Sequence, residues 1–343
     1  MLSFYGFTLE GLRSQLIQAG LPPVGAARLF NWHYKQKKTH PCDTDLAQAT
    51  MAFVREHISF ELPQIEQVQE SEDRTVKFLF RLLDGKKIET VLIPSVKKYG
   101  ICLSSQVGCA MKCSFCHTGL QGLERHLETS EIVGQYLAAQ RWLNEHRPSD
   151  NRIATIVFMG QGEPLHNFDA VKGAIEIFLS QYGLSLAADK ITISTAGFLP
   201  GLKRWKEEMP DVNIALSLHS TITEKRNKLI PINAKYPFEE IISLVDELPK
   251  KSKAVVIYEY LVTKDFNDSE ADARHLGETL RGKRAFVNLI PFNPFPEAHY
   301  ERPERSVVDQ IKVILEEYGV PSLVRYTKGH DILAACGQLN SKT

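Results

Sequence analysis

The sequence has 343 residues, 43% of them hydrophobic, which is enough for one barrel-sized domain or two smaller ones with a substantial core. Lys and Arg together number 41, as do Asp and Glu, and this formal net charge of zero excludes a chain that attracts nucleic acid by its overall field. There is neither a long apolar run nor a basic-then-apolar leader, so we expect a cytoplasmic protein without a membrane partner.

Residues 1–65 are predicted to form a small helical domain. Apolar residues recur at helical spacing over 9–17 and again over 26–34, with a Pro-Pro pair between the two segments. Residues 32–38 interleave aromatic and cationic side chains, as a surface that stacks bases and binds phosphates would. A solvated helix end explains the same pattern, so an RNA-binding accessory domain and an ordinary helix end both stay open.

Residues 66–94 are predicted to form a β-hairpin that links the helical domain to the rest of the chain. The runs 75–82 and 87–93 alternate apolar and polar residues, and Asp84-Gly85 between them is a strong turn signal. Glu89 lies in the second run, where local sequence alone predicts an exposed hairpin carboxylate.

Residues 95–331 are predicted to form an α/β domain, an incomplete parallel (β/α)6 barrel. The β-type runs are 101–104, 153–159, 190–194, 213–218, 254–261 and 285–291, and helical segments between them include 131–144, 169–179, 237–248 and 269–280. In such a barrel the loops after the strands share one rim, where active sites assemble. Residues 332–343 form a C-terminal tail that carries Cys336.

Three of the six cysteines form a compact run, Cys109-x3-Cys113-x2-Cys116, in the loop after the first barrel strand. Thiols in a reducing cytoplasm favour metal binding or catalysis over disulfides. A [4Fe–4S] cluster normally takes four thiolates, so three leave one iron open for an exchangeable ligand. We expect that ligand to be the amino and carboxylate end of S-adenosylmethionine. A zinc site completed by His117 or Cys102 is the alternative.

The cysteine run resembles the radical S-adenosylmethionine signature, in which an aromatic residue, here Phe115, precedes the last cysteine. Further blocks, in the same order, resemble the RlmN/Cfr family of RNA methyltransferases: Glu89-Thr90-Val91, 102–109, 159–165, Ser217-Leu218-His219, Asn288-Leu289-Ile290-Pro291, Asn293-Pro294-Phe295-Pro296 and 334–339. The resemblance implies a radical S-adenosylmethionine barrel whose [4Fe–4S] cluster is held by Cys109, Cys113 and Cys116. It also implies one-electron cleavage of the cofactor to a radical that abstracts hydrogen.

The resemblance assigns roles to three further residues. Cys336 would accept a methyl group as S-methylcysteine and deliver it to an adenine carbon. Cys102 would resolve the protein–RNA adduct through a transient disulfide with Cys336, and Glu89 would accept the proton from the methylated carbon. Without the resemblance, Cys336 would be interpreted as a small buried apolar residue.

The resemblance also implies contacts to S-adenosylmethionine from Gly162, Glu163, Ser194, Ser217, Leu218, His219 and Asn293. Glycine permits close backbone approach, and a carboxylate accepts hydrogen bonds from an ammonium group. A polar group satisfied within its own strand end is the alternative for each residue taken singly.

The implied substrate is structured RNA: an adenosine near the peptidyl-transferase centre of large-subunit rRNA and, in some members, the adenosine 3′ of a tRNA anticodon. Glu163-Pro164-Leu165 resembles the branch that methylates C2, although His117-Thr118-Gly119 replaces its common Ser-Thr-Ala. Candidate RNA contacts are the basic stretches 35–38, 97–98, 250–253 and 281–284. A flavodoxin or ferredoxin reductant and a monomeric enzyme are expected.

Three alternatives remain at the level of sequence. The first is a C8-adenine methyltransferase of the antibiotic-resistance type, which shares the same catalytic residues. The second is a different radical reaction such as methylthiolation, which usually needs additional cluster-binding cysteines. The third is a zinc-stabilised RNA-binding module without catalysis.

Overall fold

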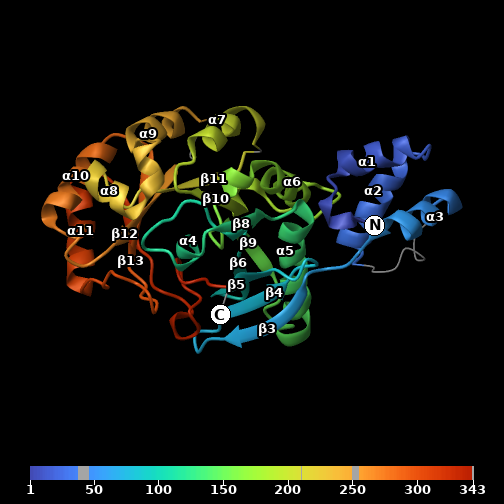
Figure 1. Ribbon diagram of the computed structural model, residues 1–343, viewed down its shortest axis with the longest axis horizontal. Helices are drawn as coiled ribbons and strands as arrows, with labels where there is room; N and C mark the ends of the chain where they lie inside the picture. Colours follow the sequence, from blue (N-terminus) through green and yellow to red (C-terminus); the bar gives the residue numbers. More distant parts are fainter. Residues whose placement is uncertain (38–45, 210, 249–254, 342–343) are drawn as a thin grey trace.

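The computed structural model describes residues 1–37, 46–209, 211–248 and 255–341 (Figure 1). Figure 1 shows a helical N-terminal part at one end and a large α/β unit that makes up the rest of the molecule. Across these described ranges, no helix is long and apolar enough to cross a bilayer.

The N-terminal part is helical, as expected, and two short strands close it. Its elements are α1 (Leu9–Gln18), α2 (Val24–Phe30), the π-helical turn η2 (Asn31–Lys35) and α3 (Gln48–His57), with β1 (Leu2–Ser3) paired in parallel to β2 (Ile58–Ser59). The Thr8 hydroxyl accepts a hydrogen bond of 3.0 Å from the Gly11 N–H and so caps the start of α1.

The aromatic side chains of the 32–38 run do not form a base-stacking surface. Trp32 and Tyr34 are buried with exposures of 2% and 6%, and Tyr34 stacks on Phe4 with a ring separation of 5.6 Å. The aromatic half of the predicted RNA-binding pattern therefore forms the domain core, whereas Lys35 and Lys37 are exposed.

A single ten-stranded sheet runs through the α/β unit, in the order β14-β13-β12-β11-β10-β9-β6-β5-β4-β3. Its parallel strands are β6 (Lys98–Cys102), β9 (Ile153–Phe158), β10 (Ile191–Thr195), β11 (Asn213–Ser217), β12 (Val256–Val262), β13 (Ala285–Pro291) and β14 (Ser322–Val324). The six predicted strands are confirmed. The short strand β14 adds a seventh that the sequence did not reveal, because three partly exposed residues give no periodic signal.

Helices cover the outside of the parallel strands, as Figure 1 shows for α7, α9, α10 and α11. These helices are α5 (Thr129–His146), α6 (Phe168–Leu179), α7 (Leu199–Glu208), α8 (Thr223–Leu229), α9 (Phe238–Glu247), α10 (Glu270–Leu280) and α11 (Arg305–Glu317). Apart from Ile257, every residue of strand β12, which has a parallel neighbour on each side, is buried, as is typical of a strand covered on both faces. This confirms the incomplete parallel barrel.

The predicted hairpin is part of the same sheet and does not stand apart as a connector. Strand β4 (Val76–Arg81) pairs antiparallel with β3 (Gln64–Glu70) on one side and with β5 (Lys87–Ser95) on the other. Strand β5 also pairs antiparallel with β6, the first of the parallel strands. The sheet therefore has an antiparallel extension. The Ser71 hydroxyl donates to Asp331 Oδ1 at 2.5 Å and the Lys77 ammonium to the Leu333 carbonyl at 3.3 Å, which docks the tail on this extension.

A small antiparallel ribbon, β7 (Gln106–Gly108) with β8 (Leu123–His126), brackets the cysteine loop and α4 (His117–Gln121). Gly108 has a φ of 73°, and a Cβ there would lie 1.8 Å from the Gly122 carbonyl oxygen. That oxygen accepts a 3.0 Å hydrogen bond from the Cys109 N–H. Only glycine therefore allows the ribbon to close at the start of the loop.

We predict that Gly108→Ala destabilises the protein far more than Gly85→Ala. Both substitutions place a side chain at positive φ, which costs roughly 1–2 kcal/mol, but nothing lies within 4 Å of a Cβ at Gly85. Gly108→Ala must also displace Gly122, so its free energy of unfolding in urea should fall by at least about 2 kcal/mol more. Equal losses in the two variants would contradict this account of the ribbon.

Candidate active site

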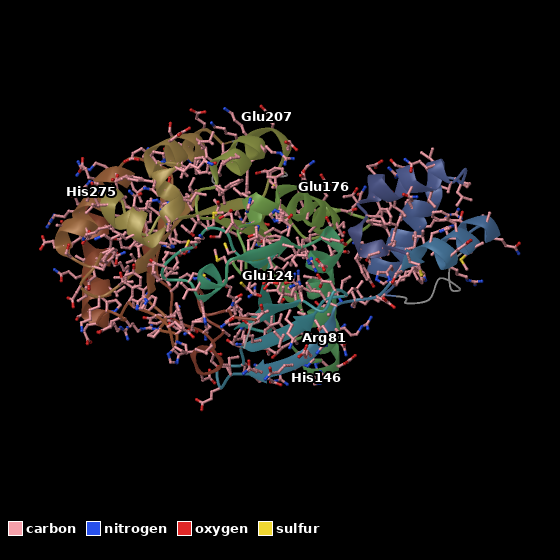
Figure 2. All side chains as sticks on the ribbon, in the orientation of Figure 1. Arg81, Glu124, His146, Glu176, Glu207 and His275 are labelled. Carbon is pink, nitrogen blue, oxygen red and sulfur yellow. The ribbon has the colours of Figure 1, made fainter. Side chains whose placement is uncertain are left out.

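The ends of the parallel strands open into one cavity on the predicted rim. It has about 870 Å³ of space not filled by atoms, which includes open solvent. Its lining includes Cys109, Cys113, Cys116 and Cys336. Figure 2 shows several sulfur atoms near the middle of the molecule, whereas labelled residues such as Glu207 and His275 lie on its outside.

The cysteine loop is held against neighbouring loops by its own backbone. The Ser114 N–H donates to the Leu229 carbonyl at 3.0 Å, and its hydroxyl donates to the Lys228 carbonyl at 2.8 Å. Phe115, the aromatic residue of the signature, packs edge-on against the His219 ring at 4.7 Å. The loop is thereby positioned by contacts to the segments that follow β11.

The environment of the three thiols disfavours free thiolates and favours thiolates that are bound to iron. Burial raises the pKa of Cys109 to about 12 and raises those of Cys113 and Cys116, because the cavity disfavours an uncompensated thiolate. A bound iron centre replaces the thiol protons and supplies the missing positive charge. The described residues contain no group of three or more His, Cys, Asp or Glu that converges on one metal ion. A cluster does not require one, since its thiolates bind different irons.

The residues proposed to complete a zinc site point elsewhere. The His117 Nε2 atom lies 2.8 Å from Asn340 Nδ2 and 3.1 Å from Glu297 Oε2, and its ring stacks on Phe295. Cys102 lines a neighbouring cavity instead of the one with the three cysteines. The donor set around the cysteine loop therefore fits a three-thiolate cluster and not a four-ligand zinc shell.

Most of the predicted cofactor contacts line the same cavity, namely Gly162, Glu163, Ser194, Ser217 and His219. Glu163 is tied to the next loop, because its carboxylate accepts the Ala196 N–H at 2.8 Å and the Leu165 N–H at 3.1 Å. Burial raises its pKa to about 7. Glu163 thus fixes two loops at the cavity and still exposes lone pairs to a bound cation.

His219 is a neutral hydrogen-bonding residue. Its Nδ1 accepts the Leu261 N–H at 3.0 Å, so the ring proton is on Nε2. Burial, with a smaller contribution from the Arg226 charge, lowers the pKa of His219 to about 3. Leu218 is buried and does not line the cavity, but its N–H donates to the Glu259 carbonyl at 3.0 Å.

A second cavity adjoins the first and is lined by Cys102 and Cys336. Its lining also includes Asn293 and Arg325. Met159, Ile290 and Cys336 line both cavities, so Cys336 lies on the wall between them. Cys336 is exposed and Cys102 is buried.

Burial and the nearby Cys336 raise the pKa of Cys102 to about 12, and the positive charge of Arg325 opposes this shift. Asn293 holds the tail, because its Nδ2 donates to the Cys336 carbonyl at 3.2 Å. The structure therefore brings Cys102 and Cys336 together beside a guanidinium group, the kind of charge that favours thiolates.

Glu89 is buried, which corrects the local expectation of an exposed hairpin carboxylate. Its Oε1 lies 3.0 Å from Lys77 Nζ, with side-chain exposures of 5% and 9%, and its Oε2 accepts the Asn340 N–H at 2.6 Å. It lines neither cavity. The tail that covers Glu89 comes from the other end of the chain, so the residues around Glu89 in the sequence could not predict its burial.

Three buried or partly buried charges near the site were missed. Arg226 is fully buried, and its guanidinium donates to the carbonyls of Ser217 at 2.7 Å and Ala196 at 3.0 Å. Nothing in its short polar helix distinguishes it from a surface arginine. Glu259 was detectable, because a carboxylate inside an apolar parallel strand is unusual. Arg325 follows the short strand β14, which was itself missed.

The predicted basic stretches remain untested as RNA contacts. Lys97 and Lys98 are exposed at the turn between β5 and β6, whereas Lys283 is paired with Asp246 at 2.6 Å. Lys38 and the stretch 250–253 lie outside the described residues.

Comparison with known proteins gives concordant matches. The sequence model of the radical SAM superfamily matches residues 103–276. The dual-specificity RNA methyltransferase RlmN of Jannaschia sp. (strain CCS1) is 38% identical over 355 residues, covering 100% of this chain and 90% of that protein. The probable dual-specificity RNA methyltransferase RlmN of Aquifex aeolicus is 39% identical, covering 98% and 96%. The crystal structure of a radical SAM methyltransferase from Sphaerobacter thermophilus superposes with a TM-score of 0.90, at 36% identity, with 100% of both chains covered.

We predict that Lys77→Met lowers the free energy of unfolding by about 3 kcal/mol, because it leaves the Glu89 carboxylate buried without its cation. The measurement is urea unfolding. The matched variant is Lys77→Met with Glu89→Gln, which removes both charges and should recover most of the loss. A Lys77→Met protein within about 1 kcal/mol of the parent would place this pair among weak surface pairs and contradict the prediction.

Proposed function

The chain belongs to the radical S-adenosylmethionine superfamily and to its RlmN family of RNA methyltransferases, and from this membership we propose that it methylates C2 of an adenine in structured RNA. It is a radical S-adenosylmethionine-dependent methyltransferase whose cofactors are a [4Fe–4S] cluster and S-adenosylmethionine. The proposal concerns the methylated carbon, the RNA and the residues that carry the methyl group.

One observation carries the proposal: Cys336 lines both cavities. One cavity is lined by the three clustered cysteines and the other by Cys102. A residue that takes a methyl group from the cofactor and delivers it to RNA must be accessible from both sides. Cys336 is also the more exposed residue of the two, although burial raises the pKa of its thiol and the Arg325 charge opposes that shift.

When bound, the cluster and S-adenosylmethionine supply one-electron chemistry that abstracts hydrogen from a methyl group. Cys109, Cys113 and Cys116 would hold the cluster, and Glu163 with Ser194, Ser217 and His219 would line the cofactor. Leu218 and Asn293 are proposed to act indirectly, since Leu218 supports the strand below the cavity and Asn293 holds the Cys336 backbone.

Cys102 is proposed to release the product. Once the methyl carbon joins the Cys336 sulfur to the adenine, the Cys102 thiolate attacks that sulfur. The sulfur–sulfur bond forms as the carbon–sulfur bond breaks, and the electron pair stays with the carbon, which takes up a proton to become the methyl group. Cellular thiols then reduce the disulfide. The shared cavity and the Arg325 guanidinium, which stabilises thiolates, support this role.

Glu89 is proposed to accept the proton that leaves the methylated carbon. It lies two residues before Val91 on β5 and therefore on the same face of the strand, and Val91 pairs with Cys102 and lines the thiol cavity. Its Oε2 is covered by the Asn340 N–H. The tail must therefore shift before Glu89 can act as a general base.

The proposed substrates are an adenosine of large-subunit rRNA and an adenosine of tRNA. The relatives are named dual-specificity RNA methyltransferases, which supports more than one RNA target. An adenine within folded RNA must leave its stack to reach Cys336, so base flipping is part of the proposal. The flavodoxin or ferredoxin reductant, the monomeric state and the cytoplasmic location stay predictions.

We predict that mass spectrometry of nuclease-digested rRNA and of nuclease-digested tRNA will find, in each, an adenosine that is a methyl group heavier only when the protein is present. Comparison with authentic 2-methyl- and 8-methyladenosine standards identifies the carbon, and we expect co-elution with the 2-methyl standard. Co-elution with the 8-methyl standard would replace the proposed C2 reaction with the C8 reaction.

We predict that Cys102→Ala accumulates protein covalently joined to RNA through Cys336, with little free methylated RNA, because no thiolate remains to break the carbon–sulfur bond. Denaturing electrophoresis with radiolabelled RNA detects the adduct. Cys336→Ala is the matched control and should form no adduct, while it still cleaves S-adenosylmethionine reductively. Normal amounts of free product from Cys102→Ala would exclude Cys102 as the resolving thiol.

A further inference from the structure

The cofactor cavity contains a carboxylate oxygen that the protein leaves unsatisfied. Glu259 on β12 lines the cavity, and its side chain is only 2% exposed. Its Oε2 atom is buried and has no hydrogen-bond partner in the described part of the chain. Such an atom is costly unless a ligand donates to it.

The other carboxylate oxygen fixes the orientation of the group. Oε1 accepts a hydrogen bond of 2.9 Å from Asn288 Nδ2 on β13, and it lies 3.9 Å from the Arg325 guanidinium beyond β14. Because both partners lie on the side of β13 and β14, Oε2 is the oxygen left for the cavity. Burial raises the pKa of Glu259, and Arg325 and Asn288 oppose that shift by favouring the charged form.

Glu259 belongs to a row of polar side chains across four adjacent parallel strands. Ser217 on β11 is in register with Glu259, and Glu259 is in register with Asn288. On β10, the Ser194 hydroxyl lies 3.4 Å from the Ser217 hydroxyl. Hydroxyls and a carboxylate side by side suit the neighbouring hydroxyls of a sugar, which acidic residues at strand ends commonly bind.

The remaining surface of the cavity suits the other parts of the cofactor. Phe158, Leu261 and Ile290 offer apolar area for a nucleobase, whereas the three cysteines mark the end where an amino acid group meets the cluster. Of the hydrogen-bond donors that S-adenosylmethionine carries, its ammonium is therefore assigned to the cluster end, and its ribose hydroxyls to the polar row.

We propose that Glu259 binds the ribose of S-adenosylmethionine, with Oε2 accepting a hydrogen bond from a ribose hydroxyl. The inference depends on the cofactor and not on the proposed methyl-carrying role of Cys336. Arg325 then has two roles. It lines the cavity with Cys102 and Cys336, and it orients the Glu259 carboxylate in the cofactor cavity.

The first test is binding of S-adenosylhomocysteine to the cluster-loaded protein, measured anaerobically by titration calorimetry. Glu259→Gln keeps the size of the side chain and the acceptor for Asn288 but loses the charged oxygen, so affinity should fall about tenfold. Asp272→Asn is the matched control, because Asp272 lies on α10 outside the cavity, has a 2% exposed side chain and pairs with Lys225 of α8. It should leave the affinity unchanged. Equal affinities for all three proteins would overturn the proposal.

The second test identifies the ribose as the contact. The parent protein should bind 5′-deoxyadenosine about tenfold more tightly than the analogue that lacks the contacted 2′- or 3′-hydroxyl, whereas Glu259→Gln should discriminate little. Glu259→Asp withdraws the oxygens by one methylene and serves if Glu259→Gln does not fold. The ribose assignment fails if removing the ribose hydroxyl lowers the affinity of both proteins by the same factor. It also fails if Glu259→Gln instead abolishes the difference in affinity between S-adenosylhomocysteine and S-inosylhomocysteine, which lacks the adenine amino group.

Discussion

The docking of the C-terminal tail decides whether the two halves of the site meet. The His117 N–H donates to the Gly337 carbonyl at 2.7 Å, and the Asn340 N–H donates to Glu89 at 2.6 Å. These bonds join the tail to the helix after the cysteine loop and to the antiparallel extension, with Cys336 on the wall between the cavities. Since one hydrogen bond contributes about 1 kcal/mol, the position of Cys336 depends on several bonds acting together.

Buried charges, and not the balanced surface charge, organise the centre of the molecule. Arg226 gathers the carbonyls at the ends of β10 and β11, Lys77 neutralises Glu89, and Arg325 lies between Glu259 and the two thiols. Each cation faces groups that would be costly to bury alone. The zero net charge of the sequence therefore says little about the electrostatics of the site, because local pairing sets the field that the thiols experience.

The sequence predicted what depends on local pattern and missed what depends on distant contacts. Strand periodicity located six parallel strands, and cysteine spacing located the loop that lines the cofactor cavity. The burial of Glu89 and of the Trp32 side chain arises from partners that no local window contains. Glu259 is the instructive case. Its charge within an apolar strand was visible in the sequence, but its unsatisfied oxygen emerged only when the strand neighbours were known.

Cys336 lies between the two cavities, and this position determines which ligands can reach it. Met159 and Ile290 line both cavities together with this cysteine, so a cofactor and a nucleotide can approach the same sulfur from different sides. On the proposed mechanism, the sulfur meets the cofactor on the cluster side and the adenine on the side of Cys102. A buried Cys336 would be inaccessible to one of them, and an exposed Cys102 would be open to premature oxidation. Cys336 is an exposed residue whose thiol pKa is nevertheless raised by burial, whereas Cys102 is buried as a whole. This contrast suits a carrier thiol that two ligands use and a resolving thiol that acts only on the adduct.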